Sequence, residues 1–495
     1  EEWHADTTRR SCSPLAASME SKERSDSAAS DESSATLLHS VSSGEFSPLG
    51  VRRMSSSQPV LRSGERGAVR TLVITHEQCT RHTTHKFCPE QPARVITLVK
   101  ALRKLQMDLS PRLYGDDDSA VAAPQKRKRD HLEPQAHSRD TEEHEGAFRL
   151  LELVTSDSLL AALEAQLLAQ PASQSIDANP VGLVRSDSVL YLEARVLPAV
   201  AAVHSPQYIQ KLRDTCRGLC ASRRRGGRGR RGRPPRLIKN ISGLNQDTYA
   251  SHNSLSAALC AVLVACRAID AVVCGDHANA FCCIRPPGHH AGVEGTTEIT
   301  RNLFVADDSD AAEKVVDRCG QGFCLLNNVA IAAKYALLQH GEIRRVAIVD
   351  WDLHHGNGTE EIVRSWPEVC YASLHGCEPL FYPGTASQLE VTERLVNVPL
   401  ARGTTASEYL EAFDTHVLPT LRRFGPDLLL ISCGFDGHML DGTDKRGFLG
   451  LDSAAFGALT ARLTALAADV CQGRLVSLLE GGYNLGPLEE CAEAH

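Results

Sequence analysis

The chain carries two alternating patterns of hydrophobic residues from about residue 70 to its end. Four segments repeat apolar residues at helical spacing: 93–105, 253–273, 327–340 and 453–470. Four shorter segments are apolar at nearly every position, as in strands buried on both faces: 280–284, 346–349, 427–432 and 475–479. Apolar strands that alternate with helices predict a mostly parallel sheet between two helical layers, an α/β fold with three α/β/α layers.

Long polar segments interrupt this pattern. Residues 1–70 are rich in serine and charged residues and nearly lack periodic apolar positions, so we expect a disordered tail. Three further polar segments, near 110–146, 218–243 and 292–320, are typical of surface insertions, because long loops are tolerated at surfaces. A length of 495 residues allows two or three domains. We predict one domain, 71–495, that carries these insertions.

Composition narrows the function classes. The 53 basic and 61 acidic residues give a net charge of -8, so binding to nucleic acid or anionic membranes would need a local patch. The 17 cysteines do not form paired CxxC knuckles, which indicates a reducing compartment. The longest apolar runs extend about ten residues, too short to span a bilayer. The chain begins without methionine, and it ends soon after Tyr483. We expect parts of the natural protein to lie beyond both ends.

Chemically active side chains follow four of the predicted strands. The loops after the strands read "RPPGHHA", "DWDLHHGNG", "CGFDGH" and "EGGYN". In open α/β sheets, sites assemble beyond the carboxyl ends of the strands. We therefore expect these loops to converge on one site.

The second of these loops has the residue types of a metal site. Asp350, Asp352 and His354 occupy alternate positions, so in an extended chain they would share a face. Asp436, after another strand, could add a further oxygen. One imidazole and two carboxylates with an open position is an arrangement used by catalytic zinc. The alternative is that one aspartate only caps the following helix, although two aspartates and two histidines within eight residues favour the metal.

Two other loops carry candidate acid–base and hydrogen-bonding groups. His289 and His290 follow two prolines and a glycine, a stiff turn that would hold adjacent imidazoles at the same edge. A histidine pair beside a metal suits proton transfer near neutral pH. Tyr483 follows "EGG", where its phenol could donate a hydrogen bond to an oxyanion.

An ordered series of strings resembles the zinc-dependent histone deacetylase family, and specifically its class II branch. The strings are "RPPGHHA", "GFCLLNNVAIAA", "VAIVDWDLHHGNGTE", "SLHG", "YPGT", "GFD" and "LEGGYNL". The resemblance implies an arginase/deacetylase-like fold in which Asp352, His354 and Asp436 bind zinc. It further implies that His289 and His290 form the acid–base pair, oriented from behind by Asp350 and Asn357, and that Tyr483 stabilises the oxyanion.

The same resemblance implies further roles. Gly322 and Phe323 correspond to one wall of the acyl-lysine tunnel, and Tyr382 falls where the facing wall usually has phenylalanine. A structural potassium would lie near the zinc loop, at main-chain oxygens of Asp350, Asp352, His354 and Leu374 and the side chain of Ser373. Arg94 resembles an internal arginine associated with acetate exit. Because a tyrosine rather than a histidine stands at 483, we expect a working deacetylase.

Two departures bear on the substrate. The segment between "GHHA" and "GFC" is about twenty residues longer than is usual, which would add chain at the tunnel rim. Counting from Asp436 places Thr443 where related enzymes carry a gatekeeping leucine or a polyamine-selecting glutamate. This threonine disfavours polyamine specificity.

Basic and serine-rich segments indicate partners. Arg223–Arg236 lies within a run of arginines whose core, Arg231–Pro234, resembles an AT-hook. Contact with DNA is one interpretation of this segment, contact with RNA a second and a solvated loop a third. "KRKR" at 126–129 matches a nuclear import signal, so we expect the nucleus, with the cytoplasm as the alternative. "RRMSSSQP" in the tail would suit phosphorylation and phosphoserine readers.

Three functions remain open from sequence. The first is zinc-dependent removal of acetyl groups from lysines of histones or other proteins, repressing transcription. The second is a chromatin-bound scaffold with marginal catalysis, and the third is an amidohydrolase of acetylated polyamines. The intact ligand set and Tyr483 favour the first.

Overall fold

The computed structural model describes residues 71–109, 148–153, 195–224, 238–240, 247–303, 313–318, 321–379, 381–442 and 447–495. These residues all belong to one compact unit. The predicted tail and much of the predicted insertions near 110–146 and 218–243 lie outside them, as does Thr443.

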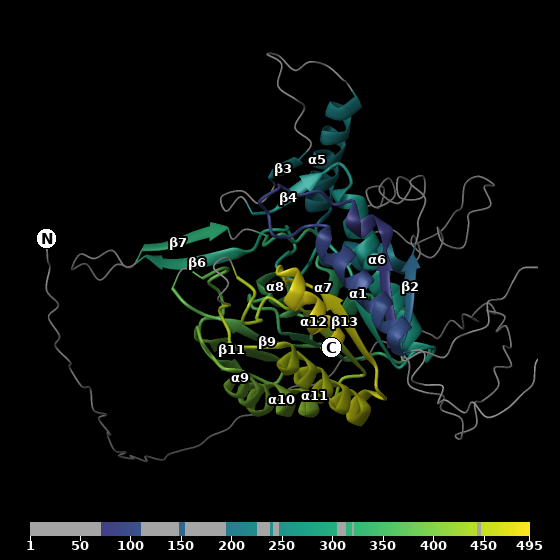
Figure 1. Cartoon of the computed structure of the whole chain (residues 1–495). Coiled ribbons are helices and arrows are strands. Elements are labelled where there is room, and N and C mark those ends of the chain that lie inside the picture. The colour runs from purple at the N-terminus through teal and green to yellow at the C-terminus, as the bar shows by residue number, and fades with distance from the viewer. Residues whose placement is uncertain are drawn as a thin grey trace, which may run out of the picture. The chain divides into compact units, whose positions relative to one another are not determined.

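A nine-stranded sheet forms the centre of the described structure (Figure 1). Its strand order is β10-β11-β9-β8-β12-β13-β5-β1-β2, and every neighbouring pair is parallel except β10 with β11. The strands are β1 Thr71–His76, β2 Phe148–Leu153, β5 Asn279–Cys283, β8 Val346–Asp350, β9 Val369–Gly376, β10 Glu390–Val391, β11 Leu395–Leu400, β12 Leu428–Cys433 and β13 Leu475–Leu479. The mostly parallel sheet confirms the predicted fold class.

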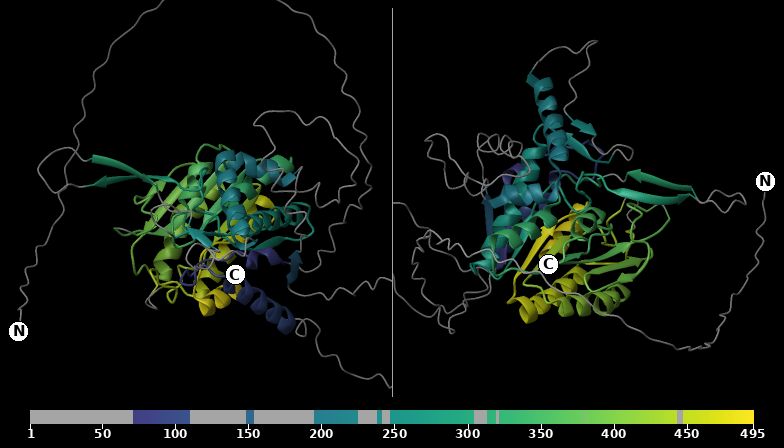
Figure 2. Two further views of the ribbon diagram at one scale, coloured as in Figure 1. Left: turned by 90° about the horizontal axis from the view of Figure 1, so that it is seen from above. Right: turned by 180° about the vertical axis from the view of Figure 1, so that it is seen from behind.

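Helices cover both faces of this sheet, which the views of Figure 2 show from two further sides. Along β8, Val346 and Ile348 pack into one hydrophobic cluster while Ala347 and Val349 pack into the other. Strand side chains alternate between faces, so each strand supplies both cores. One core contains α4 Leu197–Val203, α5 Pro206–Arg224, α6 Ser254–Val273, α7 Asn328–Gln339 and α8 Asn357–Val363; the other contains α1 Ala93–Leu109, α9 Ala406–Ala412, the π-helical turn Phe413–Val417, α10 Leu418–Phe424, α11 Ser453–Cys471 and α12 Leu485–Ala494.

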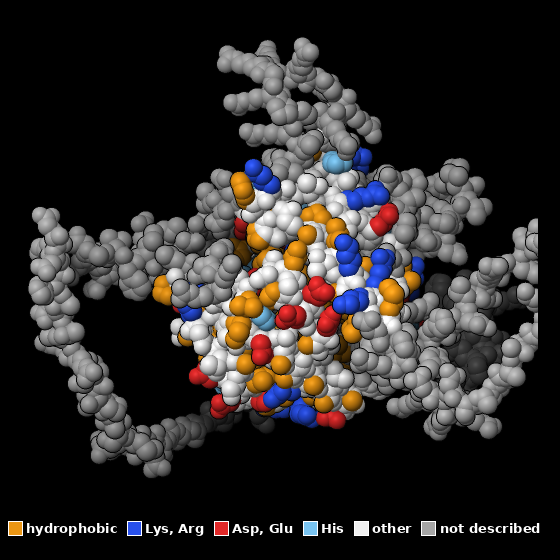
Figure 3. Space-filling view, in the orientation of Figure 1, with side chains coloured by type: hydrophobic (Ala, Val, Ile, Leu, Met, Phe, Trp, Pro, Cys, Tyr) orange, Lys and Arg blue, Asp and Glu red, His pale blue; other side chains and the backbone are white. Residues whose placement is uncertain are grey.

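Burial explains the composition of the predicted helices. By length and composition α6 and α11 could cross a bilayer, which differs from the expectation drawn from the longest uninterrupted apolar runs. In α6, however, 78% of the most apolar window is buried inside the protein. α1 instead buries Val95 and Leu98 and exposes Lys100, Arg103 and Lys104. Lys and Arg side chains accordingly gather over α1 on the face shown in Figure 3. An apolar stripe with a charged opposite face is typical of a helix that lies on a core.

Two predicted insertions contain regular structure that the polar pattern did not indicate. α5 continues to Arg224, six residues beyond position 218, and β3 Ile238–Asn240 pairs with β4 Tyr249–Ser251. In the 292–320 insertion, β6 Glu298–Leu303 and β7 Glu313–Arg318 form an antiparallel hairpin that extends away from the main sheet (Figure 1). Backbone pairing within a hairpin does not require an apolar face, so hydrophobic periodicity could not reveal it.

A buried histidine, His204, joins the end of α4 to this insertion. Its Nδ1 lies 3.0 Å from the carbonyl oxygen of Gly292, and its Nε2 accepts the backbone N–H of Asn327 at 2.9 Å. The neutral ring with its proton on Nδ1 satisfies both bonds, whereas a second proton on Nε2 would break the second one. Burial lowers the pKa of His204 to about 4.

The protein should therefore lose stability as the pH falls from 6.5 to 4. Because the folded pKa lies below the unfolded one, the folded state resists protonation, and His204 alone should account for about 3 kcal/mol of the loss at pH 4. Urea unfolding between pH 4 and 7 measures this dependence. His204→Asn should be less stable at pH 7 but lose less on acidification; equal acid losses in variant and wild type would contradict the prediction.

Candidate active site

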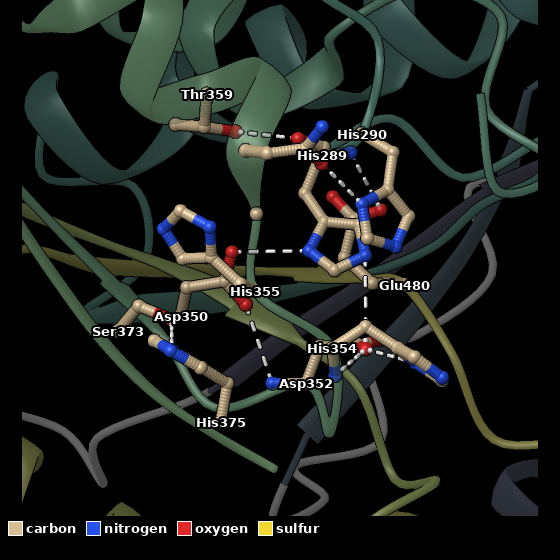
Figure 4. A network of polar contacts seen from close by, with 12 residues as sticks. His289, His290, Asp350, Asp352, His354, His355, Thr359, Ser373, His375 and Glu480 are labelled. Carbon is tan, nitrogen blue, oxygen red and sulfur yellow. Dashed lines mark hydrogen bonds and ion pairs between the residues drawn. The ribbon is translucent and has the colours of Figure 1, made fainter. Parts of the chain in front are cut away.

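The four chemically loaded loops meet at one edge of the sheet. They follow β5, β8, β12 and β13, which are adjacent in the order β8-β12-β13-β5 and run parallel. The carboxyl ends of these strands therefore lie together, as expected. Figure 4 shows side chains from three of the loops facing one another.

Asp352, His354 and Asp436 converge as the sequence predicted. One potential ligand atom from each lies within 4.8 Å of the others. Asp352 and His354 do not come together by alternation along an extended chain, as predicted, because β8 ends at Asp350. Asp352 and His354 lie in a bend, where Asp352 Oδ1 accepts the backbone N–H of His354 at 2.9 Å. Asp350 consequently does not belong to this group of three.

Backbone groups fix the two carboxylates. Gly481 donates its N–H to Asp352 Oδ2 at 2.7 Å, and Leu353 donates to Asp436 Oδ1 at 2.9 Å. His354 Nδ1 lies 2.9 Å from Asp436 Oδ2. Both aspartates are buried, while the His354 side chain is 22% exposed. Backbone hydrogen bonds thus hold the two carboxylates in place, and the His354 imidazole is accessible from solvent.

The electrostatics of this group fit a divalent cation. Burial and the charge of Asp352 raise the pKa of Asp436 to about 6. Burial opposes the charged form of His354 as well, but its hydrogen bonds to Asp352 and Asp436 raise its pKa to about 10. Asp352 and Asp436 are two buried carboxylates that share one positively charged partner, His354. A bound cation would neutralise their remaining negative charge. Two oxygens and one ring nitrogen suit zinc with an open position.

Histidines 289 and 290 lie beside the metal group with their rings 4.0 Å apart (Figure 4). His289 Nδ1 lies 3.0 Å from Asp350 Oδ2, and His290 Nδ1 lies 2.7 Å from Asn357 Oδ1. Tyr371 also donates its hydroxyl to Asp350 Oδ2 at 3.0 Å. The partners expected from the resemblance are therefore the ones that contact each ring.

Neighbouring charges shift the pKa values of the two imidazoles in opposite directions. Burial disfavours the charged form of His289, but the carboxylates of Asp352 and Asp350 raise its pKa well above the ordinary value. Burial and the positive charge of His289 lower the pKa of His290 well below it. The pKa values of the two rings therefore move in opposite directions, as is expected of paired acid and base groups.

Glu480 is a buried carboxylate that sequence reasoning missed. Its Oε2 accepts the backbone N–H of Gly288 at 2.7 Å and of His289 at 3.2 Å, and burial raises its pKa to about 7. Its Oε1 has no hydrogen-bond partner among the described residues, and Cys324 and His289 each bring a potential ligand atom within 4.8 Å of the carboxylate. The sequence signal that could have identified Glu480 is its position directly after the apolar strand β13.

Aromatic rings border the site. Phe323 and Tyr483 lie edge to face, with centroids 5.6 Å apart. Tyr382 lies 4.9 Å from His290, and Phe381, which sequence reasoning did not select, stacks on His354 at 5.2 Å. Gly322 has a left-handed φ of +48°, and a Cβ there would overlap His290. The Gly322–Phe323 segment is therefore pressed directly against the acid–base pair.

Backbone contacts hold Tyr483 in place. Asp441, another residue missed from sequence, accepts the N–H groups of Tyr483 and Asn484 at 2.6 and 2.9 Å. Arg94 donates Nε–H to the Gly482 carbonyl at 2.6 Å and lies 5.0 Å from the Tyr483 ring centroid. Burial raises the pKa of Tyr483, so its phenol remains protonated and can donate.

The predicted potassium residues lie on neighbouring strands. Ser373 on β9 pairs in register with Asp350 on β8, and Leu374 follows it. The Ser373 hydroxyl lies 2.9 Å from His375 Nδ1. The potassium site stays a prediction, as does the role of Arg94 in acetate exit.

Zinc should stabilise the metal-free protein. Binding at a hundredfold excess over the dissociation constant should add about 2.7 kcal/mol to the free energy of unfolding. Asp436→Asn, which removes one ligand charge, should abolish most of this gain. Thermal unfolding of metal-stripped protein with and without Zn²⁺ measures it; an equal gain in the variant would contradict the assignment.

Gly481→Ala should weaken zinc binding through geometry alone. A Cβ at this position would overlap the carboxylates of both Asp352 and Asp436, so the ligands would have to separate. Gly341→Ala is the matched control, because nothing lies within 4 Å of its Cβ position. Competition with a fluorescent zinc chelator should give at least a tenfold weaker affinity for the first variant, equivalent to about 1.4 kcal/mol, and no change for the second.

Comparisons with known proteins agree with this geometry. The family model described as the histone deacetylase domain matches residues 193–495. Type-2 histone deacetylase 2 of Dictyostelium discoideum is 38% identical over 262 residues, which are 50% of this chain and 14% of that protein. Histone deacetylase 15 of Arabidopsis thaliana is 39% identical over 261 residues, 51% of this chain and 41% of that protein.

A solved structure shares the fold. "Crystal Structure of HDA15 HD domain" superposes with a TM-score of 0.54 at 24% identity, covering 86% of this chain and 88% of that one. The chain spans less than half the length of the two relatives above. The family model nevertheless covers more than half of the chain, from α4 to the last residue. The chain therefore belongs to the histone deacetylase domain family.

Proposed function

We propose that this protein hydrolyses the acetyl amide of N-acetyl-lysine in proteins and that it depends on zinc. One observation carries the proposal: the three candidate ligands, the oriented histidine pair and Tyr483 all follow adjacent parallel strands and border one site. Family membership supports the same reaction class. Asp352, His354 and Asp436 would hold the zinc, which would act as a Lewis acid on the amide carbonyl and on the attacking water.

The chain's own residues would move the protons. His290 has its Nδ1 against the Asn357 oxygen, which leaves Nε2 free to accept a proton. His289, held by Asp350, would in its protonated form give a proton to the departing lysine amine. The protonated phenol of Tyr483 would donate a hydrogen bond to the oxyanion as negative charge develops there.

The channel for the acyl-lysine would lie between aromatic rings. Phe323 and Tyr483 form one contact pair, and Tyr382 lies against His290. A narrow, apolar passage favours the uncharged acetyl-lysine side chain over a free, charged lysine. Gly322 lacks a side chain where one would displace the base.

Substrate, place and partners belong to the same proposal. We propose histones as substrates, transcriptional repression as the outcome and the nucleus as the location, with support from the family name and the basic segment at 126–129. Arg223–Arg236 would contact DNA, and the serines of residues 1–70 would be read after phosphorylation; nearly all of these residues lie outside the described structure. A bound potassium near Ser373 is proposed from the family resemblance.

Tyr483→Phe should lower turnover of an acetyl-lysine peptide by about 10²- to 10³-fold, as expected when one oxyanion donor is lost. Zinc content should not change, because the hydroxyl is no ligand. Tyr409→Phe is the matched control, since the buried Tyr409 hydroxyl has no hydrogen-bond partner among the described residues. Turnover rates are measured with a fluorogenic acetyl-lysine peptide, and zinc content is measured by atomic emission.

The same assay separates the alternatives. Faster turnover of acetylspermidine than of the peptide would favour the polyamine amidohydrolase. Bound zinc without turnover of either substrate by the wild type would favour a scaffold. Unchanged peptide turnover in Tyr483→Phe would contradict the proposed mechanism.

A further inference from the structure

The inserted segment between the histidine pair and the Phe323 wall begins and ends at the site. After Ala291 the chain makes a tight loop in which Gly292 and Gly295 exchange two backbone hydrogen bonds of 3.1 and 2.9 Å. It then enters β6 at Glu298 and returns along β7 to Arg318, and these two residues pair in register. Both ends of the hairpin thus lie close to catalytic elements.

Thr297, the last residue before this hairpin, contacts the support of the base. It is 3% exposed, and its Oγ1 accepts a hydrogen bond from Nδ2 of Asn357, itself 5% exposed. The other end of the same amide, Oδ1, faces His290 Nδ1 at 2.7 Å. Three side chains therefore form a continuous series, Thr297–Asn357–His290, from the insertion to the acid–base pair.

The first residues of the loop that carries Thr297 are held from two sides. Val293 donates its N–H to Glu361 on α8 at 3.0 Å, and α8 is the helix that begins with Asn357. On the other side, His204 and Ser205 bond the carbonyls of Gly292 and Val293. The Thr297 methyl also packs close to Gly292, where a Cβ would meet it at 2.8 Å. The hydroxyl is thereby held in place against α8.

The orientation of the Asn357 amide decides what His290 can do. The oxygen and nitrogen ends of an amide have nearly the same shape, but one accepts a hydrogen bond and the other donates. With the oxygen toward His290, the ring carries its proton on Nδ1 and leaves Nε2 free as a base. With the amide rotated, Nδ1 would have to accept and Nε2 would carry the proton, which would block its use as a base.

We propose that Thr297 is a positioning residue, which holds Asn357 with its carbonyl oxygen toward His290 and so keeps His290 in the tautomer able to accept a proton. Without the hydroxyl, Nδ2 of the buried Asn357 amide loses its acceptor, Thr297 Oγ1, and such an unsatisfied donor is unfavourable. The inference rests on the proposed deacetylase function for its kinetic consequence. It also assigns the inserted segment a part in catalysis beyond the tunnel rim.

Two variants of Thr297 separate the hydroxyl from the shape of the side chain. Thr297→Val keeps the branched shape and loses the hydroxyl, whereas Thr297→Ser keeps the hydroxyl and loses the methyl. We expect Val to lower kcat for an acetyl-lysine peptide about tenfold, the effect of one buried hydrogen bond, with KM changed less than about twofold. Ser should keep kcat within about threefold of wild type. Glu294→Gln, at an exposed loop residue, is the control.

A second readout does not depend on turnover. In protein labelled with ¹⁵N-histidine, the ring nitrogen shifts of His290, assigned with a His290→Ala variant, report which nitrogen carries the proton. Wild type and Ser should show the proton on Nδ1, and Val should show a shift toward Nε2. Wild-type tautomer and wild-type kcat in Val, or equal damage in Val and Ser, would overturn the inference.

The two proposals fail in different ways. An absence of acetyl-lysine turnover in the zinc-loaded wild type would contradict the proposed function, and the His290 ring signals of the Val variant would still decide the role of Thr297. Normal wild-type turnover with a Val variant that matches it in both readouts would contradict only the role of Thr297.

Discussion

The site depends on negative charge that is buried where strands end. Asp350, Asp352, Asp436 and Glu480 are all at most 2% exposed, and they follow three adjacent strands. Burying carboxylates this close together is unfavourable unless positive charge or hydrogen bonds compensate. Backbone N–H groups of Gly481, Leu353, Gly288 and His289 provide part of the compensation, and the imidazoles provide another part. A divalent cation bound by Asp352, His354 and Asp436 would complete it.

Two hydrophobic cores support this concentration of charge from either side of the sheet. The strands β5, β8, β12 and β13 are buried and largely apolar, so the two hydrophobic clusters on either side of the sheet hold their ends in place. The polar residues begin where the strand leaves the core, as at Asp350 on β8 and Glu480 after β13. The site is thereby rigid in its backbone. A preorganised arrangement of charges costs no rearrangement during a reaction.

Sequence predicted the parts of this arrangement that depend on local pattern. The apolar runs located β5, β8, β12 and β13 together with α1, α6, α7 and α11, because burial on both faces or on one face leaves a clear periodicity. The motif loops after these strands contain the three candidate metal ligands, the histidine pair and Tyr483, which the fold brings together. The local geometry of Asp352 and His354 was predicted wrongly, since the chain bends after β8 instead of continuing as a strand.

The residues that sequence missed act through distant contacts. Thr297 reaches Asn357 across 60 positions, Asp441 reaches Tyr483 across 42, and Glu480 reaches Gly288 across 192. Thr297 and Asp441 lie in no pattern that distinguishes them from other polar residues of their loops, whereas Glu480 was marked only by its position directly after β13. The β6–β7 hairpin was not predicted for a related reason, because its strands pair through backbone groups. Such contacts become visible only when the fold brings the segments together.

The central claim is that one zinc ion joins Asp352, His354 and Asp436. Anomalous diffraction at the zinc absorption edge, from crystals of the zinc-loaded protein, locates the ion directly. The account predicts one strong peak about 2.0–2.2 Å from a carboxylate oxygen of each aspartate and from a ring nitrogen of His354. A peak among His289, Cys324 and Glu480 instead, or no ordered zinc near the carboxyl ends of β8 and β12, would contradict it.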